Sequence, residues 1–295
     1  MKSIFTLCIA LCTIITGFAQ TDTTGNPGGE GDTIRIGGMI IIRKAGSSKD
    51  TTERDREYHV KNRRGNKQSN ISTNWWILDL GFSNYVDNTI YSSAAAQAYA
   101  SGGSGVPGVP ASNNSWFQLK DGKSRSVNVW VFMQRLNIVK HVVNLKYGLG
   151  LELNNYHYKQ PIRYQASPPA IVDPPRVILD ATANRSYKKN KLAADYLTVP
   201  MMLNFNFTPN KKNGFGFSAG VSAGYLYSAR NKTITSDEGK KKAKDDFELE
   251  KWKLSYVAEL SLGPVRFYGS YAFKNMYERG LDMKPYNFGF RFSNW

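Results

Sequence analysis

The chain has 295 residues and a formal charge of +16, from 39 Lys and Arg against 23 Asp and Glu. This length suits one large β domain or two ordinary domains, and the basic balance favours an anionic partner such as lipid phosphate or an acidic glycan. The only cysteines, Cys8 and Cys12, lie near the start of the chain. Disulfides and cysteine-ligated metals are therefore excluded from the rest of it, and no other metal or cofactor is expected.

Residues 1–19 are predicted to be a secretory signal that is removed on export. An apolar run from Ile4 to Ile15 follows a lysine, and the small residues Gly17 and Ala19 suit cleavage after them. The run is too short to cross a bilayer as a helix, and no later stretch reaches about 18 continuous apolar residues. Export makes nucleic acid an unsuitable partner for the basic chain and anionic lipid headgroups a better one.

Residues 20–73 differ in composition from the rest and are predicted to be a flexible periplasmic segment. The segment opens on the Gly/Thr-rich TDTTGNPGGEGD and ends on a charged stretch with neither helical nor strand periodicity. Between the two, one short strand is predicted over residues 34–43. Such a strand can add to the sheet edge of a periplasmic or outer-membrane protein partner.

Residues 74–295 are predicted to form a single β-barrel domain, because apolar and polar residues alternate along eight segments. Alternation with period two places one set of side chains on each face of a strand. Several segments have about ten residues, close to the 9–11 that cross a bilayer at a tilt and longer than the five or six of an average soluble strand. The segments are WWILDLGF (75–82), SVNVWVFMQ (126–134), VNLKYGLGLELNNY (143–156), LTVPMMLNFNF (197–207), GFGFSAGVSAGYLY (214–227), WKLSYVAELSL (252–262), VRFYGSYAF (265–273) and YNFGFRFSNW (286–295).

The connections between these segments alternate between long and short. Long extracellular loops, short periplasmic turns and an even number of strands are typical of antiparallel outer-membrane barrels. The fold class predicted is therefore all-β, an eight-stranded antiparallel transmembrane β-barrel. The loop around SSAAAQAYASGGSGVPGVPASNNS is expected to be disordered because of its low complexity.

Two segments carry local ambiguities. In the second, either the row Val127, Val129, Val131 and Met133 or the pair Trp130 and Phe132 can face outward, and we favour the valine row. In the fourth, Pro200 removes a ladder hydrogen bond, so a bulge or kink is predicted there.

The apolar rows carry no charge and are predicted to face lipid. A Lys or Arg on the lipid face at mid-bilayer costs about 2–4 kcal/mol, which disfavours the opposite orientation. The polar rows are rich in glycine and carry charges of both signs, which are expected to pair across a narrow interior. The predicted lipid-facing residues include Leu145, Tyr147, Leu149, Leu151, Val199, Met201, Leu203, Phe205, Leu254, Tyr256, Phe288 and Phe290. The predicted interior charges are Asp79, Lys146, Glu152, Lys253, Glu259, Arg266 and Arg291.

A soluble β-sandwich or barrel is the alternative fold. Its polar face would be wet and would favour Thr, Lys and Glu over glycine. Aromatic residues gather at the ends of the apolar rows, as the girdles of a membrane barrel require, and this favours the membrane over the soluble alternative.

Five segments also carry a family resemblance: ISTNWWILDLGFSNY, VVNLKYGLGLELNNY, DYLTVPMMLNFNF, GFGFSAGVSAGYLYSA and NFGFRFSNW. Together they resemble the OmpA-type eight-stranded barrels of Bacteroidota outer membranes, the PorT-like domain group. The resemblance implies an outer-membrane barrel and no particular ligand. Trp295 departs from the pattern, because it is out of register with Phe288, Phe290 and Phe292.

Three functions are weighed on this fold. The first is a hydrolase or acyltransferase that acts on lipid A at the mouth of the barrel. Its catalytic residues would be His157, at the outer end of the third strand, and a loop serine such as Ser167. No catalytic sequence motif supports this function. A small-solute porin is disfavoured because side chains fill an eight-stranded barrel. We favour a non-enzymatic structural, adhesive or partner-docking role with the interior closed by paired charges.

The basic runs KKNK (188–191) and GKKKAKDD (239–246) are predicted to lie on outer loops. Solvated loop tips are the simplest interpretation of such runs. The functional interpretation is attraction to outer-membrane lipid, through the phosphates of lipopolysaccharide, at about 1 kcal/mol per basic side chain.

Overall fold

The computed structural model describes residues 33–36, 39–42, 69–101, 111–166, 175–182, 184–209, 211 and 214–293. The chain divides into two compact units, Met1–Gln68 and Ser69–Trp295. The predicted signal at 1–19 lies outside the described residues.

In the first unit, two short strands replace the one predicted over residues 34–43. Strands β1 (Thr33–Ile36) and β2 (Met39–Ile42) pair antiparallel, with Thr33 opposite Ile42. The single-strand prediction is wrong because it read through two consecutive glycines, a dipeptide typical of two-residue hairpin loops. The remainder of residues 20–68 lies outside the described part of the chain.

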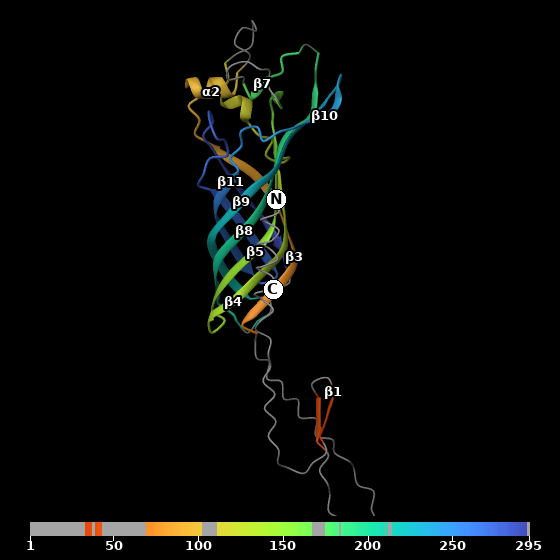
Figure 1. The fold of residues 1–295 in the computed structure, drawn as a ribbon, viewed down its shortest axis with the longest axis vertical. Coiled ribbons are helices and arrows are strands. Elements are labelled where there is room, and N and C mark those ends of the chain that lie inside the picture. The colour runs from red at the N-terminus through yellow and green to blue at the C-terminus, as the bar shows by residue number, and fades with distance from the viewer. Residues whose placement is uncertain are drawn as a thin grey trace, which may run out of the picture. The chain divides into compact units, whose positions relative to one another are not determined.

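In the second unit, one antiparallel sheet closes on itself (Figure 1). Each strand of the circuit pairs with the next in chain order, β8 with β9 included, and β13 pairs back with β3. The strands of the circuit are β3 (Ile71–Asp87), β4 (Arg125–Val139), β5 (Val143–His157), β8 (Tyr187–Asn206), β9 (Phe215–Thr235), β11 (Trp252–Leu262), β12 (Val265–Ala272) and β13 (Met283–Phe292).

The short connections β4–β5, β8–β9 and β11–β12 lie at one end of this closed sheet, and the long connections lie at the other. This follows from antiparallel order, because alternate connections fall at opposite ends. The long connections contain helix α2 (Ala94–Tyr99), a 3-10 turn (Asn114–Phe117) and the strand pair β6 (Ile162–Tyr164) and β7 (Val177–Leu179). The expectation of disorder is wrong for residues 92–101 and 111–115, while 102–110 lie outside the described residues.

Two basic runs predicted as loops form strands. Residues 188–191 belong to β8, and β10 (Gly239–Lys244) pairs with the distal half of β9. Lysine dominates both runs, so the alternation of apolar and polar residues that predicts a strand is missing from them. Thr233, Ile234 and Thr235 of β9 suit a pleated surface, and β9 supplies backbone partners to both runs.

The predicted bulge at Pro200 is wrong, because β8 and β9 pair in register through Pro200 and Ser222. The effect of proline falls on the other side of β8, where the ladder with β5 has no pair between Tyr147–Met201 and Gly150–Thr198. A missing N–H on that side interrupts the ladder without inserting a residue.

In β4, the second of the predicted segments, a bulge exchanges the inward-facing and outward-facing positions partway along the strand. Its register with β5 shifts between Trp130 and Phe132, so Val127 and Val129 keep the predicted outward side while Met133 is buried. The outward prediction for Met133 is therefore wrong. The bulge arises at Val131, beside the positive φ of 56° at Trp76 on β3. Trp75 and Trp76 are both exposed as a result.

Candidate functional site

The outward face of the closed sheet is apolar. Of the predicted lipid-facing residues, Val199, Met201, Leu203, Phe205, Tyr256, Phe288 and Phe290 are exposed, and Leu145, Tyr147, Leu149, Leu151 and Leu254 are half-buried. Met201 is 54% and Tyr256 is 59% exposed, fractions that are unusual for large apolar side chains in the middle of strands. A contiguous apolar surface of this kind marks contact with another molecule or a membrane.

Glycine on the inward rows has a second cause besides a narrow interior. Gly81 and Gly289 are opposite one another on β3 and β13. A Cβ built on Gly289 would lie 2.2 Å from the Leu80 carbonyl oxygen and 2.4 Å from Gly81 Cα. Side chains at these positions would force the two strands apart, so the glycines permit the tight curvature of the closed sheet.

The first interior cluster joins charged side chains from four strands. Arg291 on β13 donates through Nε and Nη2 to the two carboxylate oxygens of Asp79 on β3, at 2.7 Å each. Its Nη1 donates to Glu259 on β11, which also accepts from Lys146 Nζ on β5 at 2.6 and 2.7 Å. Asp79 accepts a further bond from Trp130 Nε1 at 2.7 Å. Charges of alternating sign thus run across the interior in one connected chain.

A second pair lies on the same inward face. Lys253 Nζ on β11 donates to Glu152 Oε2 on β5 at 2.6 Å, and both side chains are buried. The ammonium group also lies 5.5 Å from the centroid of the Tyr196 ring, within range of a cation–π interaction.

Arg266 is buried like the other predicted interior charges. Its guanidinium donates hydrogen bonds to Ser293. Arg135 was missed by the sequence reasoning. It stands opposite Lys146 across the β4–β5 ladder and therefore shares the inward face. The bulge at Val131 changes the parity of β4, which is why simple alternation does not reveal Arg135.

Side chains fill part of the space around these ion pairs, and an open pocket of about 550 Å³ adjoins Arg266 and Arg291 near the β11–β12 turn. Ile77, Trp130, Met133 and Met202 form a small buried apolar cluster beside them. A cavity next to Asn128, Trp130 and Glu152 measures about 20 Å³, which has room for about one water molecule.

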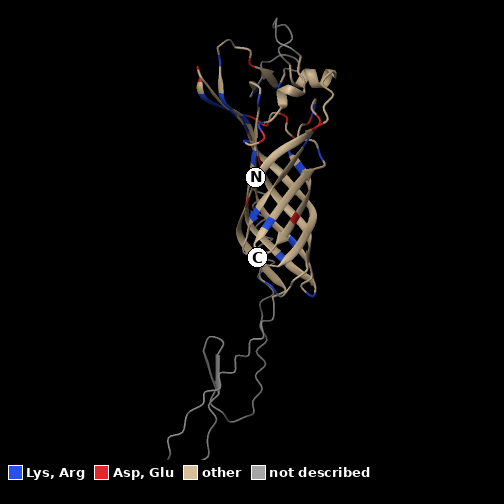
Figure 2. Ribbon diagram, turned by 180° about the vertical axis from the view of Figure 1, so that it is seen from behind, with Lys and Arg blue, Asp and Glu red and all other residues tan. Residues whose placement is uncertain are grey.

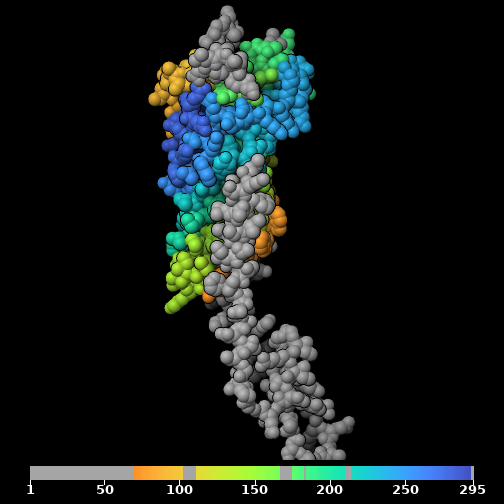
Figure 3. Space-filling model, in the orientation of Figure 1, coloured from red at the N-terminus to blue at the C-terminus, as the bar shows by residue number. Residues whose placement is uncertain are grey.

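The described residues of the four long connections form a cap over the end of the closed sheet (Figure 3). The cap has its own apolar core, which includes Tyr99, Trp116, Phe117, Phe247 and Leu249. The core also takes in side chains at the ends of the strands, so the cap and the sheet pack as one body.

Hydrogen-bonded tyrosines lie in the middle of this cap. The Tyr164 hydroxyl lies 2.7 Å from the hydroxyls of both Tyr158 and Tyr277, and Tyr99 donates to the Phe247 carbonyl at 2.6 Å. These bonds satisfy phenol groups that burial would otherwise leave without water. No single connection supplies this core, and sequence reasoning did not predict it.

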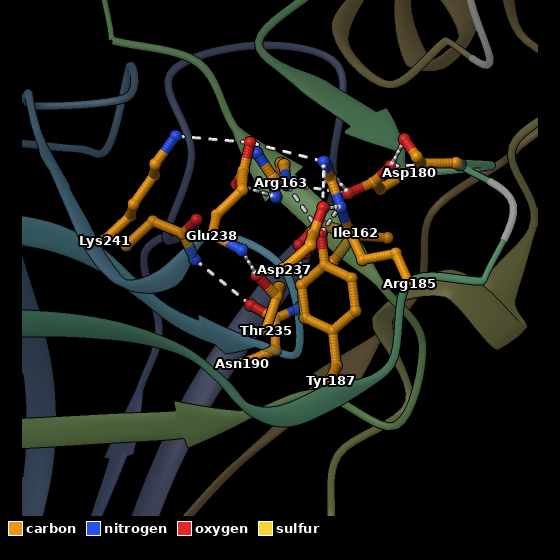
Figure 4. Close-up of polar contacts among 12 residues, drawn as sticks. Ile162, Arg163, Asp180, Arg185, Tyr187, Asn190, Thr235, Asp237, Glu238 and Lys241 are labelled. Carbon is orange, nitrogen blue, oxygen red and sulfur yellow. Dashed lines mark hydrogen bonds and ion pairs between the residues drawn. The ribbon is translucent and has the colours of Figure 1, made fainter.

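A network of ion pairs covers one side of the cap (Figure 4). Asp180, after β7, accepts from Arg163 at 2.9 Å and from Arg185 at 2.9 Å. The two arginines reach across to the β9–β10 turn, where Arg163 pairs with Glu238 at 2.6 Å and Arg185 with Asp237 at 2.7 Å. The network fixes the β6–β7 pair against the β9–β10 hairpin.

These carboxylates make the stability of the cap depend on pH. Burial alone would raise the pKa of Asp180, but hydrogen bonds from Thr182, Tyr187 and Arg185 lower it below its ordinary value. The hydrogen bond from Arg185 likewise lowers the pKa of Asp237 to about 2. A folded-state pKa below the unfolded value stabilises the fold above the unfolded pKa, and this contribution is lost as the pH falls through the folded pKa.

We therefore expect these carboxylates to leave the cap unaffected between pH 7 and 5 and to loosen it between about pH 4, the ordinary carboxyl pKa, and about pH 2. Hydrogen exchange of the β6 and β7 amides, corrected for the intrinsic pH dependence of exchange, measures this. Loss of protection between pH 7 and 5 in a His157→Ala variant, which lacks the titration of that ring, would contradict the assignment to these carboxylates.

His157 does not assemble a catalytic arrangement with described residues. Burial, and then the nearby Lys191 and Lys189, lower its pKa to about 4, so the ring is neutral at neutral pH. Its ring makes no hydrogen bond to another described residue, and Glu152 lies on the opposite face of β5. The predicted partner Ser167 lies outside the described residues.

The described part of the chain shows neither a candidate metal site nor a membrane-spanning helix. It holds no group of three or more His, Cys, Asp or Glu side chains that could bind a metal ion. It also contains no helix that is long and apolar enough to cross a membrane.

Comparison with known proteins agrees with this geometry. A family model described as an outer membrane protein beta-barrel domain matches residues 78–281, which is more than half of the chain. The match begins within β3 and ends just before β13, so it covers most of the closed sheet and the cap. A search of curated proteins finds no match to this chain. The chain belongs to the outer membrane protein β-barrel domain family.

Proposed function

We propose that the closed sheet is an eight-stranded transmembrane barrel of the outer membrane and that its interior does not conduct solutes. The uncharged outward face supports the membrane assignment, since lipid is the solvent in which such a face is stable. The narrower assignment to the OmpA-type, PorT-like barrels of Bacteroidota is part of this proposal and rests on the sequence segments that resemble them.

The closed interior is supported by the chain of ion pairs from Asp79 to Lys146, the adjoining pair of Lys253 with Glu152, and the cap with its apolar core. Opening a path would require breaking several buried charge pairs. Breaking one such pair costs about 3–5 kcal/mol when a charge is left without its partner.

The role that fits a closed barrel is non-enzymatic. It presents the cap to the outside, for adhesion or a structural contact, and the N-terminal segment with its β1–β2 pair to a periplasmic or outer-membrane protein. Replacing His157 with alanine is expected to leave the lipid A of the cell unchanged in mass spectra. An altered acylation or phosphorylation pattern would instead favour a barrel-mouth hydrolase or acyltransferase.

Single-channel recording tests the closed interior. The protein is first shown to be inserted by its heat-modifiable gel mobility and is then studied in a planar bilayer at neutral pH. We expect no stepwise conductance. Reproducible current steps of uniform size would contradict the proposal and favour a small-solute porin.

A further inference from the structure

A basic face lies on the part of the sheet that extends beyond the closed circuit. This extension consists of residues 187–193 of β8, residues 228–235 of β9, and β10. Cross-strand partners share a face, and the register places Lys191 opposite Lys232, and Lys232 opposite Lys242. Each of the two neighbouring rows adds two basic residues, so that the basic face consists of Lys189, Lys191, Arg230, Lys232, Lys240, Lys242 and Lys244.

This face points away from the β6–β7 pair. The alternate residues of β9, Asn231, Thr233 and Thr235, are buried, and Asn231 Oδ1 accepts from the Tyr164 backbone N–H in β6. The even-numbered residues of β9 therefore lie on the outer side. Figure 2 shows Lys and Arg gathered on this projecting part of the sheet.

Most of the positive charge on this face has no counter-charge. Arg230 pairs with Asp195, and among the described residues no carboxylate lies within ion-pair distance of the six lysines of the face. Burial, together with the nearby Lys189, Arg230 and Lys232, lowers the pKa of Lys191 to about 8. Like charges directly opposite one another destabilise a sheet, so an anion on this face would relieve the repulsion.

The face begins directly above a row of exposed aromatic residues. Tyr225 is opposite both Leu197 and Trp252, and the rings of Tyr225 and Trp252 lie 5.1 Å apart between centroids. A register shift next to Tyr227 brings the even-numbered residues of β9 to the outer side. Arg230 and Lys232 then lie three and five residues beyond Tyr227, about 10 and 16 Å along the strand at about 3.3 Å per residue.

We propose that this basic face binds the phosphate groups of a phosphorylated glycolipid in the outer leaflet that surrounds the barrel. The inference rests on the proposed membrane orientation, because aromatic girdles lie at headgroup level and charges just above them meet headgroup phosphates. The acyl chains of the glycolipid lie along the apolar row below, and its phosphates accept from the lysines of β8, β9 and β10. The runs 188–191 and 239–246, which are separate in the sequence, thus act as one site.

Native mass spectrometry of the full chain in detergent tests the site. The protein is mixed with diphosphorylated lipid A, with the same glycolipid after its phosphates are removed, and with inorganic pyrophosphate as competitor. We expect the diphosphorylated form to bind and the dephosphorylated form to bind at least 25-fold more weakly. Equal binding of the two glycolipids would overturn the proposal.

The double variant Lys232→Gln and Lys242→Gln is expected to weaken binding of diphosphorylated lipid A about 25-fold, at about fivefold per basic side chain. The matched control removes the same charge at the other end of the barrel, by Lys140→Gln and Lys211→Gln, both exposed positions. The control is expected to bind within twofold of the unchanged protein. Equal losses in the two variants would contradict a localised site.

Two readouts keep this inference separate from the proposed function. Heat-modifiable mobility in lipid reports barrel insertion, so its absence in the unchanged protein would refute the proposed function itself. Normal insertion without preference for phosphorylated glycolipid would refute the site alone. Displacement by pyrophosphate at the same molar concentration as the glycolipid would assign the face to free phosphate and would also overturn the lipid site.

Discussion

Replacing Val221 with arginine is expected to destabilise the protein in lipid vesicles by about 2–4 kcal/mol. Val221 is 43% exposed and lies on β9 midway between the aromatic residues Phe215 and Tyr227, which places it at the centre of the apolar band. In lipid, a guanidinium at this depth loses its hydration without gaining a partner. Denaturant titration of the refolded protein in phosphatidylcholine vesicles measures the change.

Ile90→Arg is the matched control. Ile90 is 71% exposed but lies beyond the end of β3, in the first long connection. The same substitution there is expected to change the free energy of unfolding by less than about 0.5 kcal/mol, as at an ordinary surface site. If both variants have the same small effect, the face around Val221 is in water and the membrane assignment fails.

Replacing Arg291 with methionine is expected to cost about 3–5 kcal/mol in the same assay. Arg291 is bonded to both Asp79 and Glu259, and Asp79 is fully buried. The substitution keeps much of the side-chain volume but leaves the Asp79 carboxylate with only neutral donors, such as Trp130 Nε1 and Asn128 Nδ2. The cost arises from that uncompensated charge.

Removing both members of a pair separates this effect from packing. Glu152→Leu combined with Lys253→Met takes away the second interior pair without leaving a charge behind. Well-packed apolar replacements for a buried pair are often neutral or stabilising, so we expect a change well below that of Lys253→Met alone. A double variant as unstable as the single variant would show that the loss comes from shape rather than from charge.

Alternation alone located the strands of the closed sheet, because an apolar environment on one face and a polar environment on the other impose period two on a strand. Alternation underestimated the lengths of β8 and β9, which have 20 and 21 residues. Beyond the apolar band, the outer side of these strands carries lysine and the inner side carries Asn and Thr. Polarity therefore no longer alternates, and the sequence looked like a loop.

The signs of the interior charges were readable from the sequence, but their partners were not. Glu259 forms ion pairs with both Lys146 and Arg291, which come from strands far apart in the chain. Which charges meet depends on the stagger of the strands around the closed sheet. Arg135 escaped because the bulge at Val131 inverts the parity of β4. Such bulges arise from the fit between neighbouring strands, which a single strand does not encode.

The cap was the largest omission. Its core collects Tyr99, Trp116, Tyr164, Phe247 and Tyr277 from separate connections, and none of these connections has a periodic apolar pattern of its own. A core of this kind becomes visible only once the barrel brings the connections together. The low complexity of residues 92–115 suggested disorder, although Tyr99 within this stretch is fully buried.

The central claim is that hydrocarbon surrounds the outward face, and site-directed spin labelling tests it most directly. Both cysteines of the chain, Cys8 and Cys12, lie in the predicted signal, so a single cysteine at position 201 or 90 of the processed chain carries the only label. In vesicles, we expect a label in place of Met201 to collide with oxygen far more than with a water-soluble nickel complex, and a label in place of Ile90 to show the reverse. Nickel accessibility at position 201 equal to that at position 90 would contradict the membrane assignment.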